Sequence, residues 1–151
     1  MTVFESIPEN LGVNAAWVEK GGVHWLDPSP ISVRELADAM NALHARFITI
    51  TAYQLPKDEG IRLEYHWDLD GRLLGFTFQL AGNSIGSIYD LCEAVDWIER
   101  EIHEGFVVDF LGREYEPLLL RQGDKPGVNL RETGAPDKPA SGLLGKEEVK
   151  K

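Results

Sequence analysis

The sequence predicts an α+β fold, in which a small antiparallel sheet of three to four strands carries helices packed on one face. Two stretches place apolar residues at helical spacing, and the stretches between them alternate apolar and polar residues as half-buried strands do. The dipeptide Asp70-Gly71, a strong hairpin signal, joins two of the alternating stretches. A chain of 151 residues suits one domain, which we place at residues 1–120, before a C-terminal tail at residues 121–151.

The first helix is expected to begin after Ser32 and to run to about Ala45. Ser32 and Glu35 have the spacing of a capping box, and Pro30 prevents the helix from extending upstream. The apolar residues of this stretch recur at helical spacing: Val33, Leu36, Ala37, Met40 and Leu43.

Three strands are expected to follow as an antiparallel meander. Residues 47–54 are rich in β-branched and aromatic side chains, and residues 55–60 are typical of a turn. Residues 61–69 alternate strictly, which indicates one buried and one polar face. Asp70-Gly71 then predicts a type I′ turn into a third alternating strand that extends to Leu80.

A second helix is expected from an N-cap at Ser87 to about Gly105. Asp96 and Arg100 lie four residues apart, in the order that favours an ion pair along a helix. A short strand or extended segment is expected at residues 106–110. The apolar stripe of the helix comprises Ile88, Leu91, Cys92, Val95, Ile98 and Ile102.

Composition excludes several functional classes. The chain has 25 acidic and 15 basic residues and a net charge of -10, so it is a poor binder of nucleic acid and of anionic lipid. Cys92 is the single cysteine, so the chain forms no intramolecular disulfide and cannot supply four thiolates to an iron–sulfur cluster. No apolar run is long enough to span a membrane, and residues 1–10 do not resemble a secretory signal.

The C-terminal tail differs from the body in charge and composition. Residues 121–151 contain seven basic and five acidic side chains, three prolines and no aromatic residue. Such a segment cannot bury enough apolar surface to offset the entropy of ordering. We expect it to be flexible in the free chain or draped over a partner.

Two groups of side chains could carry chemistry. Glu64, His66 and Asp68 share one face of a predicted strand, which would suit a metal site or acid–base catalysis. Alternating strands always produce such rows, so a polar sheet face is the favoured interpretation. The second group is a dense charge cluster on the second helix, for which spacing alone favours an exposed, salt-bridged helix face. Its members are Glu99, Arg100, Glu101, His103 and Glu104.

The second helical region resembles the signature of the thirty-kilodalton subunit family of respiratory complex I. Ser87-Ile88, followed by AVDWIEREIHE at residues 94–104, is similar to the family pattern S-I…A-x-W-x-E-R-E-x-x-D. Upstream, FITITA at residues 47–52 and LEYHWDL at residues 63–69 resemble the family's meander strands. The resemblance covers about residues 45–120.

Several departures from the family pattern indicate a short, divergent branch. Glu104 stands where the family usually has Asp, and Gly112-Arg113-Glu114 stands where it usually has Gly-His-Pro. The closing basic motif P-L-R-K-D is absent. Such a short subunit occurs in energy-converting membrane-bound [NiFe]-hydrogenases, which include ferredoxin-linked enzymes and enzymes coupled to carbon monoxide dehydrogenase.

The resemblance implies a cofactor-free, non-catalytic accessory subunit in the peripheral arm of such a complex. Its implied partners are a [NiFe]-hydrogenase-like large subunit, a small iron–sulfur subunit and an 8-iron ferredoxin-like subunit, which would carry the NiFe centre and the [4Fe–4S] clusters. The implied location is the cytoplasmic face of the cell membrane, reached through these partners. On this interpretation, one set of side chains forms partner contacts or a structural clamp: Trp97, Glu99, Arg100, Glu101 and Glu104.

Three alternatives remain open at the level of sequence. The first is the corresponding subunit of a complex I-like quinone oxidoreductase that is driven by NADH or ferredoxin. The second is a standalone metal-dependent enzyme that uses Glu64, His66 and Asp68. The third is a free-standing binding adaptor, which only the proteins that co-purify with it would identify.

Overall fold

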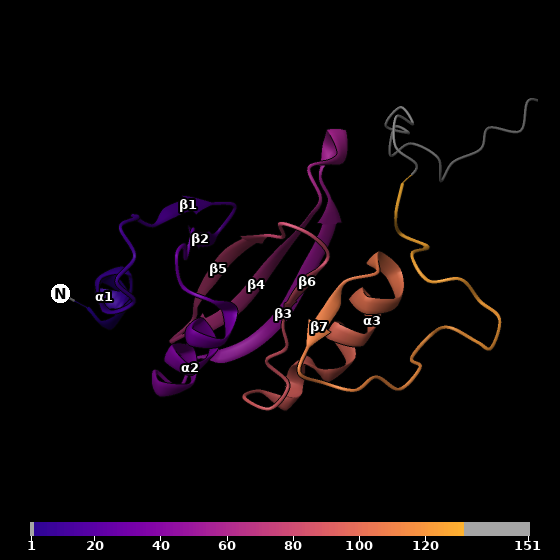
Figure 1. The fold of residues 1–151 in the computed structure, drawn as a ribbon. Coiled ribbons are helices and arrows are strands. Elements are labelled where there is room, and N and C mark those ends of the chain that lie inside the picture. The colour runs from indigo at the N-terminus through magenta and orange to yellow at the C-terminus, as the bar shows by residue number, and fades with distance from the viewer. Residues whose placement is uncertain (1, 132–151) are drawn as a thin grey trace, which may run out of the picture.

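The computed structural model describes residues 2–131. Five strands form the main sheet in the order β1-β2-β5-β4-β3, and β6 and β7 form a separate parallel pair (Figure 1). Neighbouring strands of the main sheet are antiparallel, except that β2 runs parallel to β5. The strands are β1 (Val18–Lys20), β2 (Val23–Leu26), β3 (Arg46–Gln54), β4 (Ile61–Leu69), β5 (Arg72–Gln79), β6 (Ser84–Gly86) and β7 (Asp109–Leu111).

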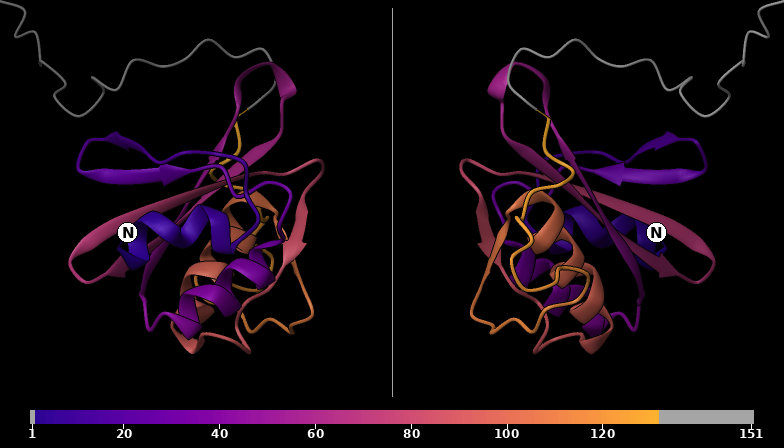
Figure 2. Two further views of the ribbon diagram at one scale, coloured as in Figure 1. Left: turned by 90° about the vertical axis from the view of Figure 1, so that its left-hand side faces the viewer. Right: turned by 90° about the vertical axis from the view of Figure 1, so that its right-hand side faces the viewer.

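Helices α2 and α3 cover the same face of the main sheet (Figure 2). This arrangement confirms the predicted α+β class, and the meander of β3, β4 and β5 is present as expected. The sheet is larger than the three to four strands predicted, because the β1–β2 hairpin adds two strands beside β5. The helices are α1 (Val3–Asn10), α2 (Val33–Ala42) and α3 (Asp96–Phe106), with 3₁₀ turns at Pro56–Asp58 and Glu93–Val95.

Helix α1 and the β1–β2 hairpin were not among the predicted elements. Thr2 and Glu5 form a capping box that starts α1. Gly21 and Gly22 both have positive φ, which lets the chain turn between β1 and β2. Trp17 connects the two elements to the core, since its ring stacks on Phe4 at 4.9 Å and meets Phe76 edge-on.

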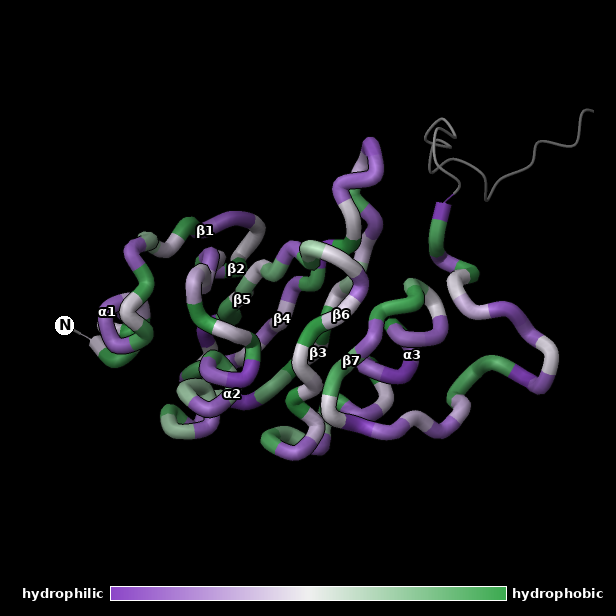
Figure 3. Tube along the Cα trace, viewed as in Figure 1, coloured by the Kyte–Doolittle hydropathy of each residue, from purple (hydrophilic) through white to green (hydrophobic). Residues whose placement is uncertain are grey.

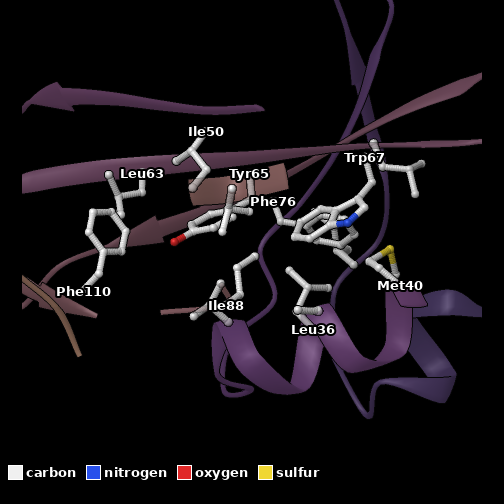
Figure 4. Close-up of a cluster of buried hydrophobic side chains, with 14 of the residues drawn as sticks. Leu36, Met40, Ile50, Leu63, Tyr65, Trp67, Phe76, Ile88 and Phe110 are labelled. Carbon is white, nitrogen blue, oxygen red and sulfur yellow. The ribbon is translucent and has the colours of Figure 1, made fainter. Parts of the chain in front are cut away.

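The core lies between the sheet and α2, as Figure 4 shows. Leu36 and Met40 point from α2 toward the ring of Trp67, and Phe110 lies near Leu63 at the other end of the cluster. Burying each of these large side chains stabilises the fold by about 1.5–3 kcal/mol. The predicted apolar face of β4 is buried throughout and comprises Ile61, Leu63, Tyr65, Trp67 and Leu69.

The prediction that the second helix begins at Ser87 is wrong, because α3 begins at Asp96. The backbone of residues 87–92 instead forms turns held from two sides. Arg34 of α2 forms a two-point ion pair with Asp90 at 2.7 and 2.8 Å and donates to the Ser87 carbonyl at 2.5 Å. Glu99 of α3 binds the hydroxyl of Ser87, so this side chain caps no helix of its own.

Residues 112–131, which we call the strap, run alongside α3 after β7 (Figure 1). Figure 3 shows this segment as mostly polar with short apolar stretches, which correspond to residues 118–120 and, near its end, to residues 128–130. The backbone N–H groups of Gly127 and Asn129 donate to the carbonyls of Glu104 and Gly105, at 2.6 and 2.9 Å. Of the predicted tail, residues 121–131 belong to the strap, and residues 132–151 lie outside the described residues. Between residues 2 and 131, the protein has no helix of the length and apolarity that a membrane span requires.

Candidate functional site

The charge cluster on α3 is centred on a carboxylate that is completely buried. Glu99 has no exposed surface. It accepts hydrogen bonds from the hydroxyl of Ser87 at 2.7 Å, from the N–H of Ile88 at 3.0 Å and from the guanidinium of Arg113 at 3.0 Å. The carboxylate therefore joins the turn before α3 to the strap after it.

Arg113 supplies the positive charge opposite Glu99. Its side chain is 5% exposed and also forms an ion pair with Asp96 in the first turn of α3. The guanidinium lies over the rings of Tyr89 and Tyr115, with its central carbon 4.8 and 5.2 Å from the ring centroids. A buried arginine with two carboxylates and two aromatic faces is strongly stabilised in place.

Arg100, one turn further along α3, holds the backbone of the strap. It forms the predicted ion pair with Asp96, at 3.1 Å. Its remaining donors bind the carbonyls of Glu116 and Pro117, at 2.9 and 3.1 Å. Only 13% of this side chain is exposed, so its charge is directed into the protein.

Glu104 binds the strap a second time, through three consecutive backbone N–H groups. Leu118, Leu119 and Leu120 donate to its carboxylate at 2.7, 2.8 and 3.2 Å. Beside it, the ring of His103 stacks on Tyr115 with the centroids 3.7 Å apart. A cleft of about 510 Å³ lies between α3 and the strap, and Arg100, Glu104 and Tyr115 are among the residues that line it.

The carboxylates of Asp96 and Glu104 make the stability of the protein depend on pH. Hydrogen bonding from Arg113 lowers the pKa of Asp96. Burial acts in the opposite direction, and a hydrogen bond from Arg100 lowers the pKa further. Burial acts to raise the pKa of Glu104, but the three backbone N–H groups outweigh burial, and the net pKa is lowered. A carboxyl with a lower pKa in the folded state stabilises the protein fully above its unfolded pKa of about 4. That contribution is lost as the pH falls through the folded pKa.

We therefore expect the wild type to exceed Asp96→Asn in free energy of unfolding by a constant amount above about pH 5. The difference should shrink as the pH falls below about 4, because the Asp96 carboxyl then takes up a proton in the unfolded chain before it does so in the folded protein. Urea unfolding at a series of pH values measures it. Glu101→Gln, which removes an exposed carboxylate from the same helix, is the matched control. A wild-type advantage that stays constant down to about pH 3 would contradict the assignment.

The five candidate residues on α3 divide into two sets. Glu99, Arg100 and Glu104 are held inside the chain, so the expectation of an exposed, salt-bridged helix face does not describe them. The side chain of Trp97 is 70% exposed, and Glu101 is exposed as well. The inward set contacts the chain itself, and the outward set remains available to a partner.

Glu64, His66 and Asp68 lie on one face of β4 but do not converge on a point. The carboxylate of Glu64 accepts from the Tyr53 hydroxyl, and that of Asp68 binds Arg46 at 3.0 Å. The ring of His66 packs edge-on against a tryptophan, and burial lowers its pKa. No three or more His, Cys, Asp or Glu side chains of residues 2–131 are arranged to hold a metal ion.

Sequence reasoning did not identify Arg113 as a member of the cluster. It follows a glycine in a segment without periodicity, beyond the end of α3, so no helical spacing connects it to Glu99. Charge counting offers a signal, since residues 87–120 contain nine acidic side chains and only two basic ones, Arg100 and Arg113. Any carboxylate buried in this stretch has few local sources of positive charge.

Comparison with known proteins gives a consistent result. Residues 29–138 match the family model described as "Respiratory-chain NADH dehydrogenase, 30 Kd subunit". The fold is similar to that of a trypsin-resistant fragment of Nqo5, with a TM-score of 0.60 and 18% identity over 75% of this chain and 98% of that one. It is also similar to a chain of an archaeal respiratory membrane complex, the membrane-bound sulfane sulfur reductase. There the TM-score is 0.64 and the identity 20%, over 83% of this chain and 78% of the other.

No curated protein matches the chain at a significant level. The family match spans more than two thirds of the sequence and includes α2, the meander, α3 and the strap. The arrangement of the main sheet and helices agrees with both solved structures. The chain therefore belongs to the family of the 30 Kd subunit of respiratory-chain NADH dehydrogenase.

Proposed function

We propose that the chain is a non-catalytic accessory subunit in the peripheral arm of a membrane-bound, energy-converting [NiFe]-hydrogenase. In this role it docks on the large catalytic subunit, at the cytoplasmic face of the membrane, and carries no redox centre of its own. A small iron–sulfur subunit and an 8-iron ferredoxin-like subunit complete the arm. The NiFe centre and [4Fe–4S] clusters belong to these partners, and the enzyme is ferredoxin-linked.

One observation carries the accessory role. The buried charged groups of the family motif are already bound within the chain. Glu99 has three donors, Arg100 binds one carboxylate and two carbonyls, and Glu104 binds three N–H groups. A general acid or base must reach the proton that it transfers. The donors and acceptors of these three side chains are instead used in hydrogen bonds within the chain. We call Glu99, Arg100, Glu104 and Arg113 the clamp, and it shapes the surface offered to a partner.

The hydrogenase branch is supported by Gly112-Arg113-Glu114, which stand where the family usually has Gly-His-Pro. A quinone-oxidoreductase arm is the second candidate, favoured by the family model, which is named for the subunit of NADH dehydrogenase. Affinity purification of the tagged full-length chain from its own cells distinguishes the two. Nickel in the recovered complex supports the hydrogenase. Quinone reduction by a complex without nickel supports the alternative.

The accessory role also predicts that the chain by itself is spectroscopically silent. We expect the isolated chain to show no visible absorption band and to contain no bound metal by elemental analysis. A band that survives purification of the isolated chain would contradict the role.

Arg100→Ala tests the clamp itself. Loss of the guanidinium frees the carbonyls of Glu116 and Pro117, so the strap no longer presents a fixed surface. We expect the variant to fail to co-purify with the large subunit, or its complex to dissociate at moderate salt. Complex that does form should turn over at nearly the normal rate per active site. If Arg100→Ala assembles normally but the complex does not turn over, the accessory role is contradicted. The control is Arg100→Lys, which keeps the positive charge and should assemble better than the alanine variant.

A further inference from the structure

Trp97 is a large aromatic side chain that the fold leaves uncovered. It is 70% exposed on α3, although the same helix buries Glu99, Ile102 and Glu104 on its inner side. Tyr89 is 39% exposed, and its ring lies against Arg113. Arg113 also binds Asp96, the residue next to Trp97, so Tyr89 and Trp97 lie in the same region of the protein. Exposed tryptophans are enriched among the residues that dominate binding energy at protein interfaces.

Two exposed carboxylates flank Trp97 along the chain, and a third lies in the strap. Glu93 and Glu101 lie four residues before and after it, and both are exposed. Glu114 is exposed next to Arg113 in the strap. In the part of the chain that the structure describes, these three carboxylates take part in no ion pair. We call Tyr89, Trp97, Glu93, Glu101 and Glu114 the Trp97 surface.

The clamp explains why the exposed carboxylates of this surface are left without ion pairs. Residues 87–120 contain only two basic side chains, and both point inward with 13% and 5% of their surface exposed. Arg100 is bound to Asp96 and two strap carbonyls, and Arg113 to Asp96 and Glu99. Arg34 of α2 also reaches this region, where it binds Asp90. None of these three arginines forms an ion pair with Glu93, Glu101 or Glu114. An aromatic anchor inside an acidic rim favours one kind of complement.

The geometry points to the Trp97 surface as the docking site for a protein partner that offers an apolar pocket with a rim of lysine and arginine. This inference rests on the proposed function, in that the partner is the large subunit. Trp97 fills the pocket, and Glu93, Glu101 and Glu114 pair with the basic rim. The rim pairs accelerate association and set its orientation, while the buried ring slows dissociation.

Substitutions on the Trp97 surface test the inference in the assembled complex. The tagged full-length chain is produced in its own cells, and the ratio of recovered partner to tagged chain is measured at low and moderate salt. We expect Trp97→Ala to weaken association at least about tenfold. Its melting temperature in isolation should match the wild type, because the side chain is exposed. Val18→Ala, at an exposed apolar residue on β1, is the matched control.

Charge reversal tests the rim separately. Glu93→Lys combined with Glu101→Lys should slow association and remove most of its salt dependence, whereas Glu19→Lys on β1 should do neither. Normal recovery of the partner with Trp97→Ala would overturn the inference. A second result would also overturn it. If Trp97→Ala weakens association in the full-length chain but not in a chain that lacks residues 132–151, the occupant of the surface is the chain's own tail and not a partner. Self-association of the wild-type chain that Trp97→Ala abolishes would identify a second copy as the occupant and overturn it too.

The outcomes also separate this inference from the proposed function. If the wild-type chain recovers a partner complex without nickel, the hydrogenase proposal fails, and the Trp97 variants still decide whether the surface binds that complex. If the wild type recovers the large subunit and Trp97→Ala recovers it equally well, the proposed function stands and the inference fails.

Discussion

Replacing Glu99 by alanine is expected to lower the free energy of unfolding by about 3–5 kcal/mol, the cost of breaking a buried ion pair by removing one partner. The substitution leaves Arg113, whose side chain is 5% exposed, with Asp96 as its only carboxylate partner. It also leaves the Ser87 hydroxyl and the Ile88 N–H without their acceptor. Urea unfolding of the isolated chain at neutral pH measures the loss.

The control for Glu99→Ala is Glu101→Ala, on the same helix. Its carboxylate is exposed, so its removal should change stability by no more than about 0.5 kcal/mol. The double variant Glu99→Ala with Arg113→Ala should lose less than the sum of the single variants, because neither charge is then left unpaired. Equal losses for Glu99→Ala and Glu101→Ala would show that the cluster contributes nothing as a clamp.

Replacing Glu104 by alanine is expected to cost about 1–3 kcal/mol, because it removes the acceptor for three part-buried backbone donors. The loss should be local, since Glu104 binds only the backbone of residues 118–120, while Arg113 and Tyr115 hold the start of the strap. The amides of residues 118–120 should exchange with deuterium much faster, while those of β4 should keep their protection. Hydrogen exchange followed by mass spectrometry resolves the two regions.

Two further variants define what Glu104 contributes. Glu104→Gln keeps one acceptor oxygen and the shape of the side chain, so its exchange rates should lie between those of the wild type and Glu104→Ala. Glu116→Ala removes an exposed strap carboxylate and leaves intact the carbonyl that Arg100 binds, so it should match the wild type. Unchanged exchange at residues 118–120 in Glu104→Ala would mean that other contacts hold the strap.

The elements that local chemistry determines were predicted well. The capping box of Ser32 and Glu35 is present, and α2 follows the helical spacing of its apolar residues. The alternation along β4 matches its burial residue by residue, and Asp70 and Gly71 both have the positive φ of the expected turn. In each case the residues that decide the structure are close neighbours in the sequence, so the local pattern is sufficient.

Elements that depend on distant contacts were not predictable in the same way. The apolar spacing of residues 88–102 imitates one long helix, but Arg34, which lies far upstream in α2, holds the first part as turns. The parallel pairing of β2 with β5 joins segments that α2, β3 and β4 separate in the sequence, and no local pattern specifies it. The candidate site follows the same rule: spacing found the Asp96–Arg100 pair, and only the fold brings Arg113 to both carboxylates.

The arrangement of Arg113 between two carboxylates has a consequence for how sequences of this family can drift. The resemblance to the family pattern places Arg113 where that pattern usually has histidine, whose neutral ring carries no charge and offers one donor. Arg113 brings a permanent charge and five donors, and it uses them on Glu99, which belongs to the pattern, and on Asp96, which the pattern leaves unspecified. We therefore expect selection on position 96 to be conditional on position 113. In an alignment of family members, an acidic residue at 96 should accompany arginine at 113 and become neutral to selection where histidine stands there.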